Sequence, residues 1–403
     1  MPHEKSDTGA RGLVRLWASL RLYTVLCALV ATTVFRETGA EMSVAMWPPA
    51  RPLGGWLSRL FLAPWNRWDV EYYVLIATEG YGRDNGTAAF HPLLAWLSAP
   101  LAWVGLNTVL ALLVVSSLAC LFAYIAFEKL ALVDQTPETA RTSTLFFIFW
   151  PTSYVLFAPY TESLWLACGV ACLLFARRGR WWLAGAAGGL AALTKQQGVI
   201  LALPLAWELW EASGRDVRRA FTLWRKWLAL GLVPLGLLVW MVFRQIALDD
   251  FRPDFSSFNA LVYSTVISPS SNKVVWDQGF MWPWKAAWLG FKSAWDLWRL
   301  DPWMSLAFGL LFVAASAVAW RGMRTSYRLF VLAILLVTLS YHTGMNNTSG
   351  AYISLPRHLM LAFPVFLGLG ARAGERWRPF VKYVGLAGFT FLLFGYFSKW
   401  LLA

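Results

Sequence analysis

Residues 107–128 read NTVLALLVVSSLACLFAYIAFE, an apolar run whose one charged residue is the Glu at its end. A helix that crosses the hydrocarbon core of a bilayer needs about 20 mostly apolar residues. About eleven such stretches follow one another along the chain, separated by short polar segments. Hydrophobic residues make up 58% of the 403-residue chain and charged residues 14%. The sequence therefore predicts an all-α polytopic membrane protein.

The apolar runs predict one membrane domain, 1–403, with no separate soluble domain. The run from His91 to Val104 is short and contains Pro92 and Pro100, so we expect an interfacial or re-entrant helix there. With these spans, two long segments, 36–106 and 248–301, lie on the same side of the membrane. The second is rich in Trp, Pro and Ser, which is typical of an amphipathic segment at the membrane interface. The predicted spans are 16–35, 107–128, 143–158, 161–176, 181–194, 198–212, 227–247, 302–320, 328–344, 357–371 and 381–400.

The distribution of basic residues predicts the orientation. With the N-terminus in the cytoplasm, 21 of the 35 Lys and Arg residues and nine of the 22 acidic residues fall in cytoplasmic segments or at the cytoplasmic ends of the spans. The positive-inside rule describes this bias, so the two long segments are expected outside. Topology also explains the net charge of +13 better than nucleic-acid binding does, because the basic residues cluster between apolar runs. No cleavage site follows the first run, which predicts an uncleaved anchor.

Neither disulfides nor a metal site are expected. Cys27, Cys120, Cys168 and Cys172 all lie within apolar runs and have no metal-ligand neighbours in the sequence. No outward DxD motif is found, and the adjacent Asp249 and Asp250 come closest to one. We therefore predict that no metal or other cofactor is required.

The segment NRWDVEYYVLIATEGYGRDNGTAAFHPLLAWLSAP, residues 66–100, follows the first span. Asp69 and Glu71 lie two residues apart beside Trp68, and His91 follows further on. A carboxylate among aromatic rings at the mouth of a membrane cavity suits a general base, because partial desolvation raises its proton affinity. The alternative is an interfacial helix with an aromatic belt and a solvated acid.

Two further outer turns carry polar residues. In FWPTSYVLFAPYTESLWL, residues 149–166, Tyr160 and Glu162 could bind sugar hydroxyls, or Glu162 could simply complement a helix dipole. The turn LTKQQGV, residues 193–199, carries Lys195, Gln196 and Gln197. A lysine at that depth on the outer face suggests an anionic partner such as a lipid-linked phosphate, although it could also snorkel to headgroups.

A possible anion site precedes the tenth span. Arg357 and His358 follow Pro356 where a helix begins, and a helix N-terminus with a forked donor nearby binds anions. The alternative is a structural arginine paired with an acid. Three of the four histidines (His91, His342 and His358) fall at the same face as the polar turns, which predicts one outward-facing polar cavity.

Five segments, in order, carry a family resemblance: WDVEYYVLIATEGY, AAFHPLLAWLSAP, SYVLFAPYTESLWL, RGRWWLAGAAGGLAALTKQQGVI and LPRHLMLAFPVFL. Together they span positions 68–367. They resemble the PIG-V family of glycosyltransferases, the type that adds the second mannose in GPI-anchor assembly, and its bacterial relatives. The chain departs from the family pattern at His91, where Phe or Tyr is common, and at KQQG.

The resemblance implies a GT-C type fold and inverting transfer from a polyprenyl-phosphate hexose, typically mannose, with an acid after the first span as the essential group. That acid is Asp69 here, with Glu71 as a helper. Lys195, Arg357 and His358 would neutralise the lipid phosphate. The expected sugar and acceptor contacts are Trp68, His91, Tyr160, Glu162, Gln196 and Gln197.

The acceptor, whether lipid-linked, glycan or protein, is left open, as is the membrane: a bacterial plasma membrane, or the endoplasmic reticulum in a eukaryote. The competing class is a transporter or flippase for a lipid-linked or anionic solute, which would also use an outward cavity with Lys and Arg. Against that class, the chain has no obvious inverted halves, and its polar residues gather at one face rather than at the midplane.

Overall fold

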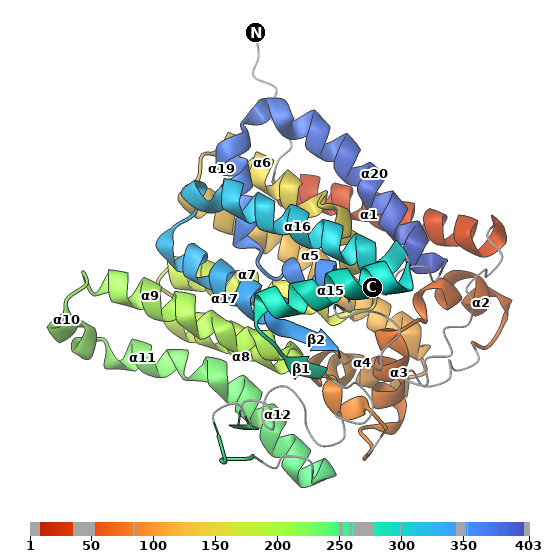
Figure 1. The fold of residues 1–403 in the computed structure, drawn as a ribbon, viewed down its shortest axis with the longest axis horizontal. Helices are drawn as coiled ribbons and strands as arrows, with labels where there is room; N and C mark the ends of the chain where they lie inside the picture. The colour runs from red at the N-terminus through yellow and green to blue at the C-terminus, as the bar shows by residue number, and fades with distance from the viewer. Residues whose placement is uncertain are drawn as a thin grey trace.

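The computed structural model describes residues 9–34, 53–83, 85–249, 253–257, 260–261, 278–298, 300–343, 352 and 354–398. Much of the predicted outer segment 248–301 lies outside these residues. Within them the fold is helical, and the one sheet pairs β1 (Gln278–Phe280) with β2 (Tyr341–Thr343) in antiparallel register, Gly279 opposite His342. The predicted all-α class is confirmed (Figure 1).

Among the described residues, the α-helices differ widely in length, from five residues to 27. The α-helices are α1 (Ala10–Val34), α2 (Trp56–Leu62), α3 (Asp69–Glu79), α4 (Leu93–Trp103), α5 (Thr108–Asp134), α6 (Pro137–Ile148), α7 (Thr161–Arg177), α8 (Trp181–Thr194), α9 (Ala202–Ala212), α10 (Val217–Thr222), α11 (Trp224–Leu230), α12 (Leu232–Leu248), α15 (Pro283–Leu297), α16 (Leu300–Ala319), α17 (Thr325–Ser340), α18 (Leu355–Leu359), α19 (Pro364–Ala373) and α20 (Arg378–Phe397). Short 3-10 helices include η1 (Ala63–Trp65), η3 (Pro151–Phe157), η4 (Gln196–Leu201) and η6 (Trp320–Gly322).

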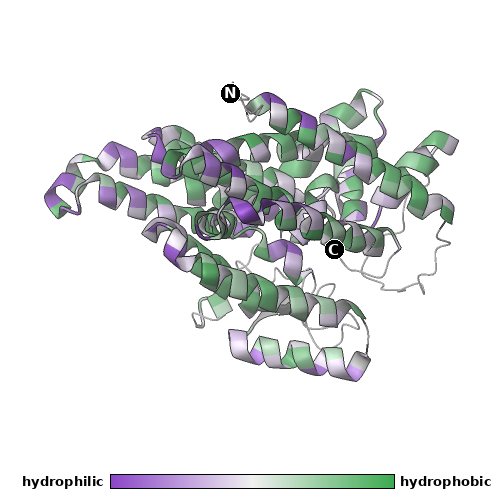
Figure 2. Ribbon diagram, turned by 90° about the horizontal axis from the view of Figure 1, so that it is seen from above, coloured by the Kyte–Doolittle hydropathy of each residue, from purple (hydrophilic) through white to green (hydrophobic). Residues whose placement is uncertain are grey.

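Several described helices are long and apolar enough to cross a membrane, which makes the chain a multi-pass membrane protein. Most of the ribbon is coloured as hydrophobic in Figure 2. The five that satisfy length and composition within the described residues are Ala10–Val34, Thr108–Asp134, Trp224–Leu248, Pro302–Gly322 and Glu375–Phe397. The pair η3 and α7 would count as a sixth, bent by 100°. The expected total of about eleven spans stays a prediction.

The remaining predicted spans correspond to shorter helices. The runs 181–194 and 198–212 become α8 with 14 residues and α9 with 11. The predicted span 143–158 is interrupted, because α6 ends at Ile148 and Trp150 is extended before Pro151, where the proline ring disfavours helical backbone. The run 91–104 forms the short helix α4, and its expected interfacial or re-entrant position stays a prediction.

Helix α8 packs closely on α12 because both helices carry glycine at the contact. A Cβ added to Gly189 would lie 2.5 Å from the carbonyl oxygen of Leu232, and one added to Gly236 would lie 2.0 Å from the carbonyl oxygen of Gly189. Only residues without a side chain permit such an approach, which is a common way for membrane helices to associate. This packing fixes the position of α8, whose end carries Lys195.

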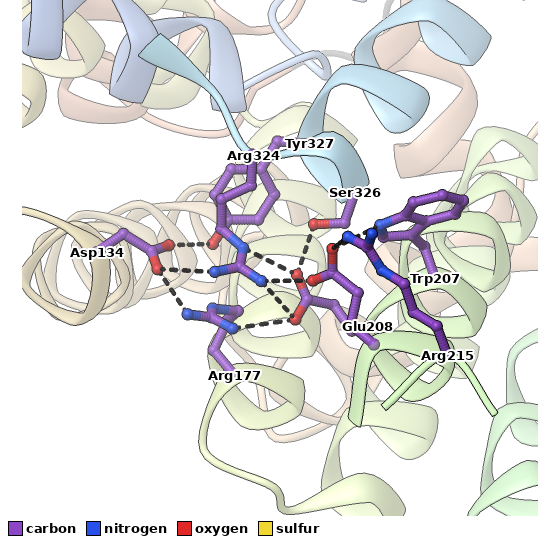
Figure 3. A network of polar contacts seen from close by, with 9 residues as sticks. Asp134, Arg177, Trp207, Glu208, Arg215, Arg324, Ser326 and Tyr327 are labelled. Carbon is purple, nitrogen blue, oxygen red and sulfur yellow. Dashed lines mark hydrogen bonds and ion pairs between the residues drawn. The ribbon is translucent and has the colours of Figure 1, made fainter. Parts of the chain in front are cut away.

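A polar network joins α5, α7, α9 and the start of α17 (Figure 3). Arg177 donates to Asp134 at 2.7 Å and to Glu208 at 3.0 Å, while Arg324 reaches Glu208 at 3.2 Å. Tyr327 donates to Asp134 at 2.7 Å. Glu162 and Arg177 stand at opposite ends of α7, about 22 Å apart at 1.5 Å per residue. The network therefore marks the end of the helix bundle opposite to Glu162.

Candidate active site

Asp69 is the first residue of α3, where a sharp backbone turn precedes it. Trp68 has a φ of 57°, an uncommon conformation for a residue with a side chain, and its ring is buried. The first turn closes through the amide of Glu71, which donates to the carbonyl of Trp68 at 3.0 Å. An acid in the first helical turn is also stabilised by the helix dipole.

Arg357 lies in the five-residue helix α18, which begins after Ser354 with its φ of 58°. Its Nη2 donates to Oδ2 of Asp69. Its Nε lies 3.6 Å from Oε1 of Glu162, and the guanidinium stands 4.7 Å from the centre of the Tyr160 ring. Arg357 thus connects α18 to the starts of α3 and α7, which are far apart in sequence.

Lys195 completes the cluster from the turn between α8 and η4. Its Nζ donates to Oε1 of Glu162 at 2.5 Å, and Glu162 is fully buried. The turn requires glycine at position 198, because a Cβ there would lie 2.1 Å from the amide nitrogen of Ala192. Two acids, Asp69 and Glu162, therefore pair with two bases, and this mutual neutralisation allows Glu162 and Arg357 to be buried beside the half-buried Asp69 and Lys195.

Two histidines, His91 and His358, lie next to the charged side chains of this cluster. His358 follows Arg357 in α18 and is half-buried. Burial lowers the pKa of His91 to about 3, although a hydrogen bond with the backbone of Ala192 opposes the shift. The His91 imidazole is therefore neutral near pH 7 and can accept as well as donate hydrogen bonds.

The buried cluster contains most of the residues predicted from the sequence, but not all of them. Tyr160 and Glu162 meet Arg357 directly, and Glu162 is engaged in ion pairs, a role that the sequence alone did not indicate. Gln197 is buried and Gln196 half-buried in η4. His91 packs 5.5 Å from the Trp240 ring. The Asp69–Arg357 pair does not include Glu71, and the side chain of His342 lies outside the described residues.

Arg21 lies next to the segments that carry the cluster, and the sequence did not predict it as a site residue. Arg21 of α1 donates through Nη1 to the carbonyl of Phe157 at 2.7 Å, just before the Tyr160 turn. Its guanidinium also lies 5.8 Å from the Trp65 ring, just before the Trp68 turn. A basic residue inside a predicted span was the available signal, since such residues are costly in a membrane and usually have a specific partner.

The described residues contain no group of three or more His, Cys, Asp and Glu side chains placed to hold a metal ion. All four cysteines carry free thiols in this part of the chain. The expectation that no metal or other cofactor is required stays a prediction.

The fold and the cluster together define a class: a multi-pass helical membrane protein with a buried polar site made of two acid–base pairs. Residues 11–203 match the family described as mannosyltransferase (PIG-V). The predicted resemblance to this family is thereby confirmed over the first half of the chain. The matched region contains Asp69, Glu162 and Lys195, whereas Arg357 lies beyond it.

Individual relatives agree with the family match. GPI mannosyltransferase 2 of Yarrowia lipolytica is 28% identical over 201 residues, which are 49% of this chain and 51% of the relative. GPI alpha-1,6-mannosyltransferase 2 of Rattus norvegicus is 27% identical over 207 residues, which are 48% of this chain and 42% of the relative. The chain spans about half the length of the curated relatives that it matches.

Among solved structures, the chain is similar in fold to ArnT from Cupriavidus metallidurans. The crystal structure of ArnT bound to undecaprenyl phosphate aligns with a TM-score of 0.49 and 14% sequence identity, covering 93% of this chain and 63% of that one. The apo state aligns with a TM-score of 0.47 and 15% identity, covering 90% and 59%.

Proposed function

We propose that this chain is a GT-C type membrane glycosyltransferase that moves a hexose from a polyprenyl-phosphate donor to an acceptor on the extracytoplasmic face. The observation that carries the proposal is the contact of Asp69 with Arg357 beside the Glu162–Lys195 pair, because Asp69, Glu162 and Lys195 lie in the region that matches the PIG-V family. The names of the relatives favour mannose as the sugar.

The two bases suit the leaving group of such a reaction. As the bond from the sugar to the lipid phosphate breaks, the phosphate gains negative charge, and cations already in place lower the barrier. Lys195 and Arg357 are held within one buried cluster, with His358 next to them. The donor phosphate would compete with Glu162 and Asp69 for these cations.

Competition between the donor phosphate and Asp69 for Arg357 would also release Asp69 to act as the base. In inverting transfer the acceptor attacks from the ring face opposite to the leaving phosphate, so Asp69 and the phosphate-bound Arg357 must stand on opposite sides of the sugar. Their direct contact therefore belongs to the donor-free state. When the phosphate takes Arg357, Asp69 can accept the proton of the acceptor hydroxyl. Trp68 would shield this position from water, and Glu71 would assist.

Several buried polar atoms beside the two ion pairs are suited to hydrogen-bond a sugar. Oε2 of Glu162, Oε1 of Gln197 and Nδ1 of His358 have no hydrogen-bond partner within the described part of the chain. Leaving such an atom unsatisfied costs about 1–3 kcal/mol, so a ligand with several hydroxyl groups would be stabilised here. Tyr160, His91 and Gln196 lie in the surrounding segments and complete the predicted sugar and acceptor contacts.

A turnover assay in detergent tests the proposal against the transporter alternative. Purified protein would be offered a panel of polyprenyl-phosphate hexoses with candidate acceptors, and products would be identified by mass spectrometry. Transfer chemistry survives the loss of two compartments, whereas transport does not. A donor-dependent glycosylated product is expected; movement of a lipid-linked sugar across reconstituted vesicles without any product in detergent would contradict the proposal.

A further inference from the structure

The turn between α9 and α11 carries an unusual concentration of uncompensated charge. Residues 213–228 read SGRDVRRAFTLWRKWL. Arg215 pairs with Glu211 at 3.3 Å, but Arg218, Arg219, Arg225 and Lys226 form no ion pair with any carboxylate of the described chain. By contrast, the bases of the nearby network in Figure 3 are paired. Four uncompensated cations within nine residues call for a negatively charged partner.

The same turn exposes a row of large apolar side chains. Val217 is 60% exposed, Phe221 77%, Trp224 56% and Leu228 56%. Val217 and Phe221 are four positions apart on α10, and Trp224 and Leu228 are four positions apart on α11, so each pair lies on one face of its helix. Apolar side chains interleaved with Lys and Arg are typical of a segment that lies in the membrane interface.

Hydrogen bonds within the chain order this turn, although many of its side chains are exposed. Asp216 caps α10 by accepting from the amide of Arg219 at 3.0 Å. The indole of Trp227 donates to the carbonyl of Ala220 at 3.1 Å, which ties α11 back to α10. These contacts hold the apolar row and the cations in a defined arrangement before any partner binds.

Its position points to lipid as the partner. Helix α10 follows α9, whose Glu211 joins the network opposite to the Asp69 cluster, and it lies at the far left of Figure 1. The helix that follows is the candidate span Trp224–Leu248, so the apolar row continues directly into a membrane-crossing surface. A partner that covers both the row and the cations is a bilayer surface with anionic headgroups.

We propose that the α10–α11 turn is a binding surface for anionic phospholipids of the leaflet opposite to the Asp69 cluster. Phe221 and Trp224 enter the interface, and Arg218, Arg219 and the following basic pair contact headgroup phosphates. The proposal is independent of the transfer chemistry. An acidic soluble protein is the competing partner, but it would leave the apolar row without a reason to continue into the span.

Hydrogen exchange tests the surface in the intact protein. The full chain would be placed in lipid discs of phosphatidylcholine alone and in discs of equal parts phosphatidylcholine and phosphatidylglycerol. Amides of 213–226 are expected to exchange more slowly in the anionic discs. Each Lys or Arg near an anionic surface strengthens binding by about fivefold, so each single Gln substitution should reduce the extra protection by up to that factor.

Matched variants separate charge from folding. Replacing all four cations, R218Q, R219Q, R225Q and K226Q, should abolish the difference between the two discs, whereas R218K, R219K and R225K should retain it. Gln at Arg372, Arg376 and Lys382, in the basic segment where α19 ends and α20 begins, should leave it unchanged. Equal exchange of wild-type protein in both discs would overturn the proposal, as would protection by soluble polyglutamate in phosphatidylcholine discs.

Discussion

Asp69 and Glu71 are two residues apart on α3, so at 3.6 residues per turn their side chains point about 200° away from each other. Asp69 contacts Arg357 in the cluster, and we assign it as the base. Asp69→Asn keeps the size and most hydrogen bonding but removes the base, so turnover should fall by about 10²- to 10⁴-fold while donor binding persists.

Glu71→Gln is the matched control for this substitution and should have a milder effect. Initial rates and equilibrium donor binding by purified protein would measure both. Near-normal turnover of Asp69→Asn contradicts the assignment. Loss of turnover in Glu71→Gln alone, with folding and donor binding intact, would reverse it.

Lys195 has two roles that can be separated, because it both pairs with Glu162 and is predicted to bind the lipid phosphate. Lys195→Met should weaken donor use by about 10- to 100-fold, the value of one charge-assisted contact. It also leaves the buried Glu162 with a weaker partner at 3.6 Å, which destabilises the fold.

Adding Glu162→Gln to Lys195→Met removes both charges of the pair and should recover much of the lost thermal stability. Donor binding should stay weak in this double variant. Melting temperature and donor titration provide the two readouts. Unchanged donor saturation in Lys195→Met, or in Arg357→Ala, would refute the phosphate site.

His91 makes stability depend on pH in a defined direction. Its pKa falls from 6.5 to about 3 on folding. Between these values the unfolded chain binds a proton that the folded chain does not, so acidification below pH 6.5 destabilises the fold by up to about 1.4 kcal/mol per pH unit. His91→Phe removes this contribution, and its melting temperature should fall less than that of wild type between about pH 7.5 and about pH 5. An equal fall of the melting temperature in both proteins would contradict a buried, neutral His91.

At the scale of the elements, α1 supports the site from behind through Arg21. Arg21→Gln removes the charge-assisted donation to the carbonyl of Phe157, which precedes the Tyr160 turn. Such a bond is worth about 1.5–3 kcal/mol, so the melting temperature and turnover should both fall. Arg11→Gln, an exposed position on the same helix, is the control and should be neutral. Normal activity and stability of Arg21→Gln would remove Arg21 from the supporting layer.

The sequence predicted long elements better than short ones. The predicted runs 107–128 and 302–320 correspond closely to Thr108–Asp134 and Leu300–Ala319, because a continuous apolar stretch dominates every local signal. The run 143–158 was placed wrongly, since Pro151 ends helical geometry inside an apolar stretch. Runs shorter than a bilayer's thickness leave both length and orientation to tertiary packing.

The sequence predicts which side of the membrane the site residues share, but not which of these residues contact one another. Charge bias placed Asp69, Lys195 and Arg357 on one side of the membrane, and the structure brings these residues into one cluster. Their partners could not be derived, because the Asp69–Arg357 contact joins residues 288 positions apart. Such a pairing depends on how α3, α7 and α18 pack, which no local pattern encodes.

At the scale of the whole molecule, the orientation of the chain stays a prediction together with its single-domain organisation. The four native cysteines lie within the helices and are largely buried, so a cysteine introduced at Gln196 gives a clean signal. We expect it to react with an impermeant thiol reagent in intact cells, and one introduced at Arg218 to react only after the cells are opened. The reverse pattern would invert the topology.

The central claim, that this chain transfers a hexose from a lipid phosphate, is tested most directly by product stoichiometry. Purified wild-type protein in detergent would be given polyprenyl-phosphate mannose and a range of acceptors, with free polyprenyl phosphate and glycosylated product measured together. We predict one polyprenyl phosphate released for each product formed, with inversion at the anomeric carbon. Absence of released polyprenyl phosphate with every sugar donor and acceptor, from protein that is folded and binds donor, would contradict the claim.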